Sequence, residues 1–86
     1  MGLVCQAQAE YTIAVTYHEK SLNIARQIND KRGEADQLTY IGDAYVALHE
    51  TGKAKEYYRR AKALYDNLRV NYRLVELEKK LSRLEG

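Results

Sequence analysis

The side chains best suited to metal binding or nucleophilic catalysis are few in this sequence. They are one cysteine, Cys5, and two histidines, His18 and His49. Their positions match neither the C-x-x-C nor the H-x-x-x-H spacing that holds zinc, and no base is assigned to Cys5. The sequence also shows no carboxylate pair, glycine-rich phosphate loop or triad-like set. We therefore predict that the protein is not an enzyme and uses no metal and no cofactor.

A basic run between residues 53 and 62 is the best candidate for nucleic-acid binding. It consists of Lys53, Lys55, Arg59, Arg60 and Lys62. These residues alternate with Glu56 on the expected outward face of a helix, and the formal net charge of the chain is only +2. Nucleic-acid affinity grows with the number of phosphates neutralised, so a solvated helix face explains the run better. We predict no nucleic-acid partner.

The length and composition favour one small domain without a membrane segment. The chain has 86 residues, and no apolar run approaches the roughly 20 residues of a membrane span. The first four residues lack the basic and apolar regions of a signal peptide. A single cysteine permits no intramolecular disulfide, so no oxidising compartment is needed. We predict a cytoplasmic protein with no membrane partner.

The sequence pattern predicts that the whole chain is helical. Apolar and small residues recur at steps of three and four, which places them on one helix face. Three such series precede a fourth with 4-3-4-3 spacing, and no proline interrupts any of them. We expect breaks at 29–31 and 49–52, with Thr51 as a helix cap, and a cap for the last helix at Asp66–Asn67. The series are Ala14, Tyr17, Ser21, Ile24, Ala25 and Ile28; Ala35, Leu38, Ile41, Tyr45 and Leu48; Ala54, Tyr57, Ala61, Leu64 and Leu68; and Val70, Leu74, Leu77, Leu81 and Leu84.

The chain also contains an internal repeat. Gly2 falls on Gly42, Ala14 on Ala54 and Tyr17 on Tyr57, and most of the matched residues are small or apolar. Small residues let paired helices approach closely, so we expect Gly42 to lie at a helix–helix contact where leucine is harmful and alanine much milder. The repeat indicates an all-α stack of antiparallel helix hairpins.

The stretch from Tyr40 to Tyr45, followed by Ala54, Tyr58 and Ala61, resembles the tetratricopeptide-repeat (TPR) signature. The 40-residue period is similar to the long-helix class found in kinesin light chains, Pins-type polarity scaffolds and bacterial signalling proteins. The resemblance implies a right-handed α-solenoid that binds a peptide or protein segment in a concave groove. We interpret the chain as a single domain with a partial repeat at 1–30, a full repeat at 31–67 and a closing helix at 68–86, excised or engineered from a longer array.

In such solenoids the first helix of each repeat lines the groove. The resemblance places these partner-binding positions at Gln6, Asp36, Thr39, Tyr40, Asp43, Val46, Glu76, Lys79 and Arg83. A structural, self-associating end of a larger scaffold is the alternative function, and a homodimer is a further expected partner.

The N-terminal residues leave two arrangements open. Residues 1–8 form a short first helix that folds back at a turn from Gln8 to Tyr11, or the turn opens into one helix from about Leu3 to Ile28. No glycine or proline lies between Gln8 and Tyr11. Opening bares the face with Ala14, Tyr17, Ile24 and Ile28, which a second chain could cover.

Overall fold

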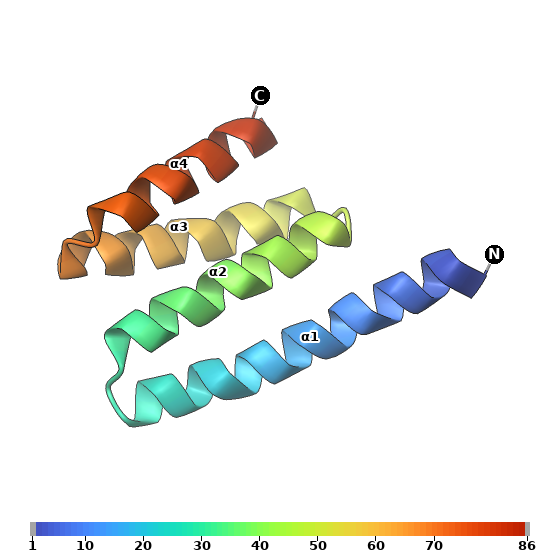
Figure 1. Ribbon diagram of the computed structural model, residues 1–86, viewed down its shortest axis with the longest axis horizontal. Coiled ribbons are helices and arrows are strands. Elements are labelled where there is room, and N and C mark those ends of the chain that lie inside the picture. The colour runs from blue at the N-terminus through green and yellow to red at the C-terminus, as the bar shows by residue number, and fades with distance from the viewer. Residues whose placement is uncertain (1, 86) are drawn as a thin grey trace.

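The four helices stack in chain order, as the sequence pattern predicts. The computed structural model describes residues 2–85, with side chains described from Gln8 onward. The helices are α1 (Gly2–Gln27), α2 (Lys31–Ala47), α3 (Thr51–Leu68) and α4 (Asn71–Glu85). Each helix packs antiparallel to the next, so that α1 and α4 form opposite ends of the stack (Figure 1). No strand occurs among these residues, and the all-α solenoid arrangement is confirmed.

The three connections share one geometry and recur at equal intervals along the chain. Asn29, His49 and Arg69 each adopt a left-handed conformation, with φ of 58°, 62° and 59°. At each of them, the left-handed residue and its successor donate backbone hydrogen bonds to carbonyls three and five residues back. This is the Schellman motif that ends helices, and here it uses no glycine. Because a single residue separates the left-handed one from the next helix, each turn reverses the chain.

The core lies between α2 and its two neighbours. Ala54 and Ala61 are fully buried on α3, and the large Tyr58 and Tyr65 are also buried there. Gly42 packs against the Tyr58 ring so closely that an added Cβ would lie 2.6 Å from a ring carbon. Gly42 therefore stands at a helix–helix contact, as expected. A methyl group already approaches this buried ring too closely, so alanine should also carry a cost there, and the prediction that it is milder than leucine stays a prediction.

The N-terminal segment does not fold back. α1 runs without a break through residues 8–11, which confirms the opened-helix alternative and excludes a separate first helix in this structure. The face of α1 expected to pack is consequently exposed: Tyr17 is 68% and Ile28 67% accessible. The buried side of α1 consists instead of Val15, Leu22 and Ala25.

Two predicted caps are wrong. Thr51 is the first residue of α3 and Glu50 takes the cap position, without a side-chain hydrogen bond. Asp66 lies inside α3, which continues to Leu68 because Arg69 supplies the left-handed stop. Asp30 does cap α2, since its carboxylate accepts a hydrogen bond from the Gly33 N–H at 2.9 Å. Among residues 2–85, no helix is both long and apolar enough to cross a membrane.

Candidate functional site

Polar side chains line one face of the stack, where long side chains of α2 and α4 reach one another across α3. Two direct contacts join these helices. The Lys80 Nζ donates to Asp43 Oδ1 at 2.9 Å, and the Arg32 guanidinium donates to the Tyr72 hydroxyl at 2.7 Å. α3 stands behind them in the stack. Side chains from all three helices therefore meet on this face, which we call the α2/α4 face.

Two similar layers of side chains cross this face seven residues apart. In the first, the Tyr58 hydroxyl donates to Asp43, and the Lys80 ammonium lies 5.6 Å from the Tyr58 ring centre. In the second, the Tyr65 hydroxyl donates to Asp36. Seven residues are two helical turns, or about 10 Å at 1.5 Å per residue.

Arg73 completes the second layer, because α4 carries it seven residues before Lys80. The charge of Asp36 acts on this guanidinium, whose Nε is buried without a hydrogen-bond partner. The pKa of Arg73 is raised, mainly by its side-chain interaction with Tyr72. Arg73 also forms an ion pair with Glu76 at 3.5 Å. Each layer thus has a tyrosine of α3 hydrogen-bonded to a carboxylate of α2 and a cation at the equivalent place on α4, and in the first layer that cation also pairs with the carboxylate.

The two buried tyrosines stay protonated through the physiological range. Burial raises the pKa of the Tyr58 phenol well above its usual value, and the hydrogen bond to Asp43 adds to the effect. The pKa of Tyr65 is raised in the same way by burial and by Asp36. Both phenols therefore act as hydrogen-bond donors that hold the carboxylates of α2 in place.

A shallow hollow of about 230 Å³ lies beside the first layer. Apolar side chains from α2 and α4, Val46 and Leu84, form part of its lining. Asp43, Lys80 and Arg83 contribute charges to the same hollow. A mixture of apolar floor and convergent charges suits a protein side chain of the same mixed character.

The structure brings together three of the nine predicted partner-binding residues: Asp43, Val46 and Arg83 all line this hollow. Lys79 also lies on α4 but faces a neighbouring depression shared with Val75 and Ser82. Glu76 is exposed nearby and is held by Arg73.

The other predicted residues differ in what they can contact. Thr39 is buried, and its hydroxyl donates to the Ala35 carbonyl at 3.0 Å, so it is unavailable to a partner. Asp36 is half-buried and engaged by Tyr65. Tyr40 is 43% exposed and stacks on His18 with ring centres 5.2 Å apart. The side chain of Gln6 lies outside the described residues.

Sequence reasoning missed Tyr58, Lys80 and Leu84 as lining residues of the hollow. The sequence held a signal for Tyr58 and Lys80. A spacing of seven residues occurs in three pairs: Asp36 and Asp43, Tyr58 and Tyr65, and Arg73 and Lys80. Equal spacings align in layers across packed helices, since α2 and α4 run parallel to each other and antiparallel to α3. Leu84 carried no comparable signal. It was assigned to the apolar seam of the last helix.

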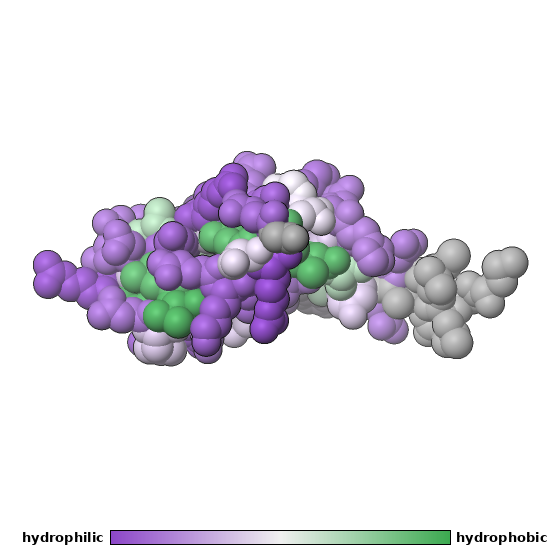
Figure 2. Space-filling view, turned by 90° about the horizontal axis from the view of Figure 1, so that it is seen from above, coloured by the Kyte–Doolittle hydropathy of each residue, from purple (hydrophilic) through white to green (hydrophobic). Residues whose placement is uncertain are grey.

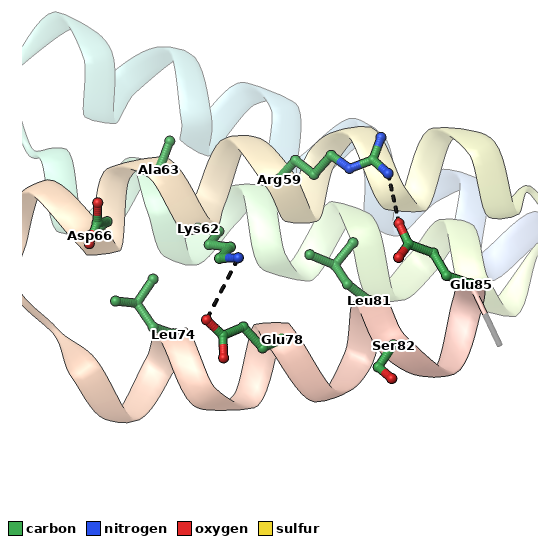
Figure 3. A pocket seen from close by; sticks show the side chains of 9 residues that line it. All are labelled: Arg59, Lys62, Ala63, Asp66, Leu74, Glu78, Leu81, Ser82 and Glu85. Atoms are coloured by element: carbon green, nitrogen blue, oxygen red, sulfur yellow. Dashed lines mark hydrogen bonds and ion pairs between the residues drawn. The ribbon is translucent and has the colours of Figure 1, made fainter.

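A second, larger groove of about 880 Å³ separates α3 and α4 at the end of the stack (Figure 3). Ala63, Leu74 and Leu81 supply its apolar surface. Two ion pairs span from one helix to the other, as Figure 3 shows. Lys62 pairs with Glu78 at 3.6 Å, and Arg59 with Glu85 at 2.7 Å. These partners are exposed, so the pairs mainly make this end of the stack polar.

His18, considered above as a possible metal ligand, has a structural role. It is half-buried on α1, and its Nδ1 lies 2.7 Å from the Gln37 Oε1 of α2. In the part of the chain that the structure describes, no three His, Cys, Asp or Glu side chains come together as a metal site would require.

Comparison with known proteins gives two findings. A family model described as tetratricopeptide repeat matches residues 1–67. A designed protein, DA05, whose solution structure was determined by NMR, is similar in fold with a TM-score of 0.78. It is 24% identical in sequence, and the match covers 83% of this chain and 71% of the designed one. No curated protein matches this sequence.

Proposed function

Because this chain belongs to the tetratricopeptide-repeat family, whose members generally mediate protein–protein interaction, we propose that it binds a peptide or protein segment along the α2/α4 face. The hollow formed by Asp43, Val46 and Arg83 is the observation that supports this proposal most directly. The neighbouring Lys79 extends the binding surface along α4.

The charges of the α2/α4 face favour an acidic segment with an apolar anchor. Asp43 already neutralises Lys80, and Glu76 neutralises Arg73. Among the side chains described, Lys79 and Arg83 take part in no ion pair and are exposed. A bound segment would place an apolar residue against Val46 and Leu84, and a carboxylate within reach of Lys79 or Arg83.

The binding test uses a displayed library of random peptides of about 15 residues, selected on the purified chain. We expect selected peptides to be acidic, and to lose at least tenfold in affinity, equal to about 1.4 kcal/mol, on Arg83→Glu. Asp43→Lys should also change binding. The matched control is Arg60→Glu, because Arg60 is exposed on α3 and lies over Tyr57 rather than on this face. Equal losses for both arginine variants, or none for Arg83→Glu, would place the ligand elsewhere.

The proposal extends to the domain division, the cellular location and the subclass of the repeat. The domain division into a partial repeat at 1–30, a full repeat at 31–67 and a closing helix at 68–86 follows α1, the α2–α3 hairpin and α4 to within a few residues. A single cysteine is compatible with the reducing cytoplasm, where we place the protein. Membership of the long-repeat class of kinesin light chains and Pins-type scaffolds is supported by the 40-residue period.

Self-association is the second proposed role. The specific observation in its favour is the exposed apolar surface of α1, where Tyr17 and Ile28 are each about two-thirds accessible. A larger scaffold built from such chains would use this end for assembly and the α2/α4 face for its ligand.

A further inference from the structure

One side of α1 carries four large apolar residues that nothing in the described structure covers. They are Ile13, Tyr17, Ile24 and Ile28, and their accessible fractions run from 56% to 68%. Steps of four, seven and four residues place all of them on one side of the helix. We call this set the α1 stripe. It lies apart from Val15, Leu22 and Ala25, which bury the other side of α1 against the stack.

The repeat supports a helix-binding role for the middle of the α1 stripe. One repeat later, α3 carries Tyr57, Leu64 and Leu68 at the positions of Tyr17, Ile24 and Ile28. There α2 packs on α3, and Tyr57 lies 5.5 Å from Tyr45 of α2. Tyr57 and Leu64 are partly buried against the core and Leu68 is 39% exposed, whereas Tyr17, Ile24 and Ile28 are all at least 56% exposed. The α1 side stays bare because α1 continues straight where a turn would reverse the chain.

α4 of a second copy fits this surface poorly. α4 is the first helix of its repeat, as α2 is of the repeat before. The exposed side of α4 is therefore the natural candidate to pack on the α1 stripe of another copy. However, Glu78 and Glu85 replace Leu38 and Tyr45 at the contact positions. Docking α4 would bury two carboxylates that now form exposed ion pairs, and removing charges from water costs more than such pairs return. Figure 2 shows the α4 side as a mainly hydrophilic surface with only scattered apolar patches.

A second copy of α1 fits well, since the α1 stripe is self-complementary. Its residues are placed symmetrically about the midpoint between Lys20 and Ser21: 13 and 28 add to 41, and so do 17 and 24. An antiparallel pair of α1 helices therefore sets isoleucine against isoleucine at each end, and tyrosine against isoleucine nearer the centre. Ser21 at the centre is small enough for close approach, and the Lys20 stem can lie along the edge with its ammonium in water.

We propose that two copies of this chain form a two-fold symmetric dimer through antiparallel packing of their α1 stripes. The inference rests on the second role proposed above and is independent of ligand binding on the α2/α4 face. A two-fold contact uses the same surface on both chains and closes at two copies. The α1 stripe spans about 22 Å from Ile13 to Ile28 at 1.5 Å per residue, so the interface is small and the dimer is concentration-dependent.

The first experiment measures mass by sedimentation velocity from about 10 to about 1000 μM, where interfaces of this size dissociate. The mass should rise from one chain to two and stop there. Ile24→Lys should keep the chain monomeric throughout, with unchanged helicity, because Ile24 is exposed in the monomer. The matched control is Val75→Lys, a change of the same kind at an exposed apolar residue of α4, which should dimerise like the parent chain.

A mixing experiment tests the antiparallel register. Tyr17→Glu and Ile24→Lys should each be monomeric alone. Mixed in equal amounts they should form a heterodimer, because the two-fold sets the new carboxylate opposite the new ammonium while the remaining Tyr17–Ile24 contact stays apolar. A parallel pair offers no such complementation.

Four results would overturn the proposal: a constant mass of one chain at the highest concentration, dimerisation unaffected by Ile24→Lys, dissociation caused by Val75→Lys, or growth beyond two chains. The last two would indicate head-to-tail packing of α1 on α4. Peptide binding that survives Ile24→Lys keeps the two proposals separate, because loss of the dimer then leaves the ligand face intact.

Discussion

The two ends of this helical stack differ in character although their helices occupy equivalent places in a repeat. At the α1 end, Tyr17 and Ile24 are exposed, whereas Tyr57 and Leu64, their equivalents on α3, are partly buried against the core. At the α4 end, ion pairs from Lys62 to Glu78 and from Arg59 to Glu85 cross the terminal groove. Terminal repeats of a solenoid need a polar outer surface to remain dispersed. The α4 side is polar in this way and the α1 side is not, so the α1 side is the one suited to association.

The largest effect should come from comparing Gly42 with Ser82, its equivalent in the next repeat. Gly42→Leu forces a side chain into the buried Tyr58 ring and should lower the free energy of unfolding by about 1–3 kcal/mol or more. Gly42→Ala should also destabilise, by less. Ser82→Leu, on the exposed side of α4, should change stability by no more than about 0.5 kcal/mol. Urea unfolding followed by circular dichroism measures all three, and equal losses at 42 and 82 would remove the distinction between interior and end.

The next largest effect should be a loss of stability at alkaline pH that comes from the buried tyrosines and not from the exposed α1 stripe. The pKa values of Tyr58 and Tyr65 are raised in the folded state. Above about pH 10 the unfolded chain releases these protons while the folded chain keeps them, so the free energy of unfolding falls as pH rises. Below about pH 10 the stabilisation is fully present. Urea midpoints at about pH 8 and about pH 11 should show the decline.

Phenylalanine variants test whether the buried tyrosines cause this loss of stability at alkaline pH. Tyr58→Phe loses the hydrogen bond to Asp43, costs about 1 kcal/mol near neutral pH, and should make the alkaline decline shallower. Tyr17→Phe, in the exposed α1 stripe, should leave the decline unchanged. A decline that is identical in all three proteins would place its origin outside the buried layers.

A smaller and opposite effect is expected at the turns. His49 holds a left-handed conformation that favours glycine, so His49→Gly should raise the free energy of unfolding by about 0.5–1 kcal/mol. Ala9 precedes Asn29 by the same interval that separates Asn29 from His49, so the series of turns would continue there, but it sits within α1. Ala9→Gly should therefore lower the helicity of α1, since glycine weakens a helix interior. Stabilisation by glycine at 9 would mean that the chain turns there.

A small change in stability should accompany the most informative change in association. Replacing Lys62 and Glu78 together by leucine copies the apolar Leu22 and Leu38 found at the equivalent positions upstream. Exposed ion pairs contribute little, so stability should shift by no more than about 1 kcal/mol. Sedimentation should then show species larger than two chains, because the α1 end and the α4 end would both present apolar surfaces for association. A double variant that still stops at two chains would show that the ion pairs do not close the α4 end.

The helices and their order were predictable because the apolar residues repeat at steps of three and four, and the internal repeat set how they stack. The turns were only partly predictable. Glycine usually supplies the left-handed residue that ends a helix, and His49 and Arg69 gave no such sign. The same lack of glycine and proline near Ala9 lets α1 continue, so the repeat period and the local sequence disagree there and the local sequence prevails.

The candidate site was predicted less completely than the fold. The resemblance to the TPR family grouped Asp43, Val46 and Arg83 on one face, and the three line one hollow; that a partner binds there stays a prediction. Thr39 was assigned to the same face but is buried, since its position relative to the packed Ala35 could not be read from spacing alone. Lys80 was missed because its contact with Asp43 depends on the rotation of α4 against α2. That rotation is set by packing and not by any local pattern.

The most direct test of the protein-binding assignment is an NMR titration of the isotopically labelled chain with a selected acidic peptide. Under this assignment, the amide resonances of Asp43, Val46 and Arg83 shift most, in proportion to bound peptide. Resonances of the α1 stripe should respond to protein concentration and not to peptide. Peptide-induced shifts concentrated on Tyr17 and Ile24, with the α2/α4 face unchanged, would contradict it.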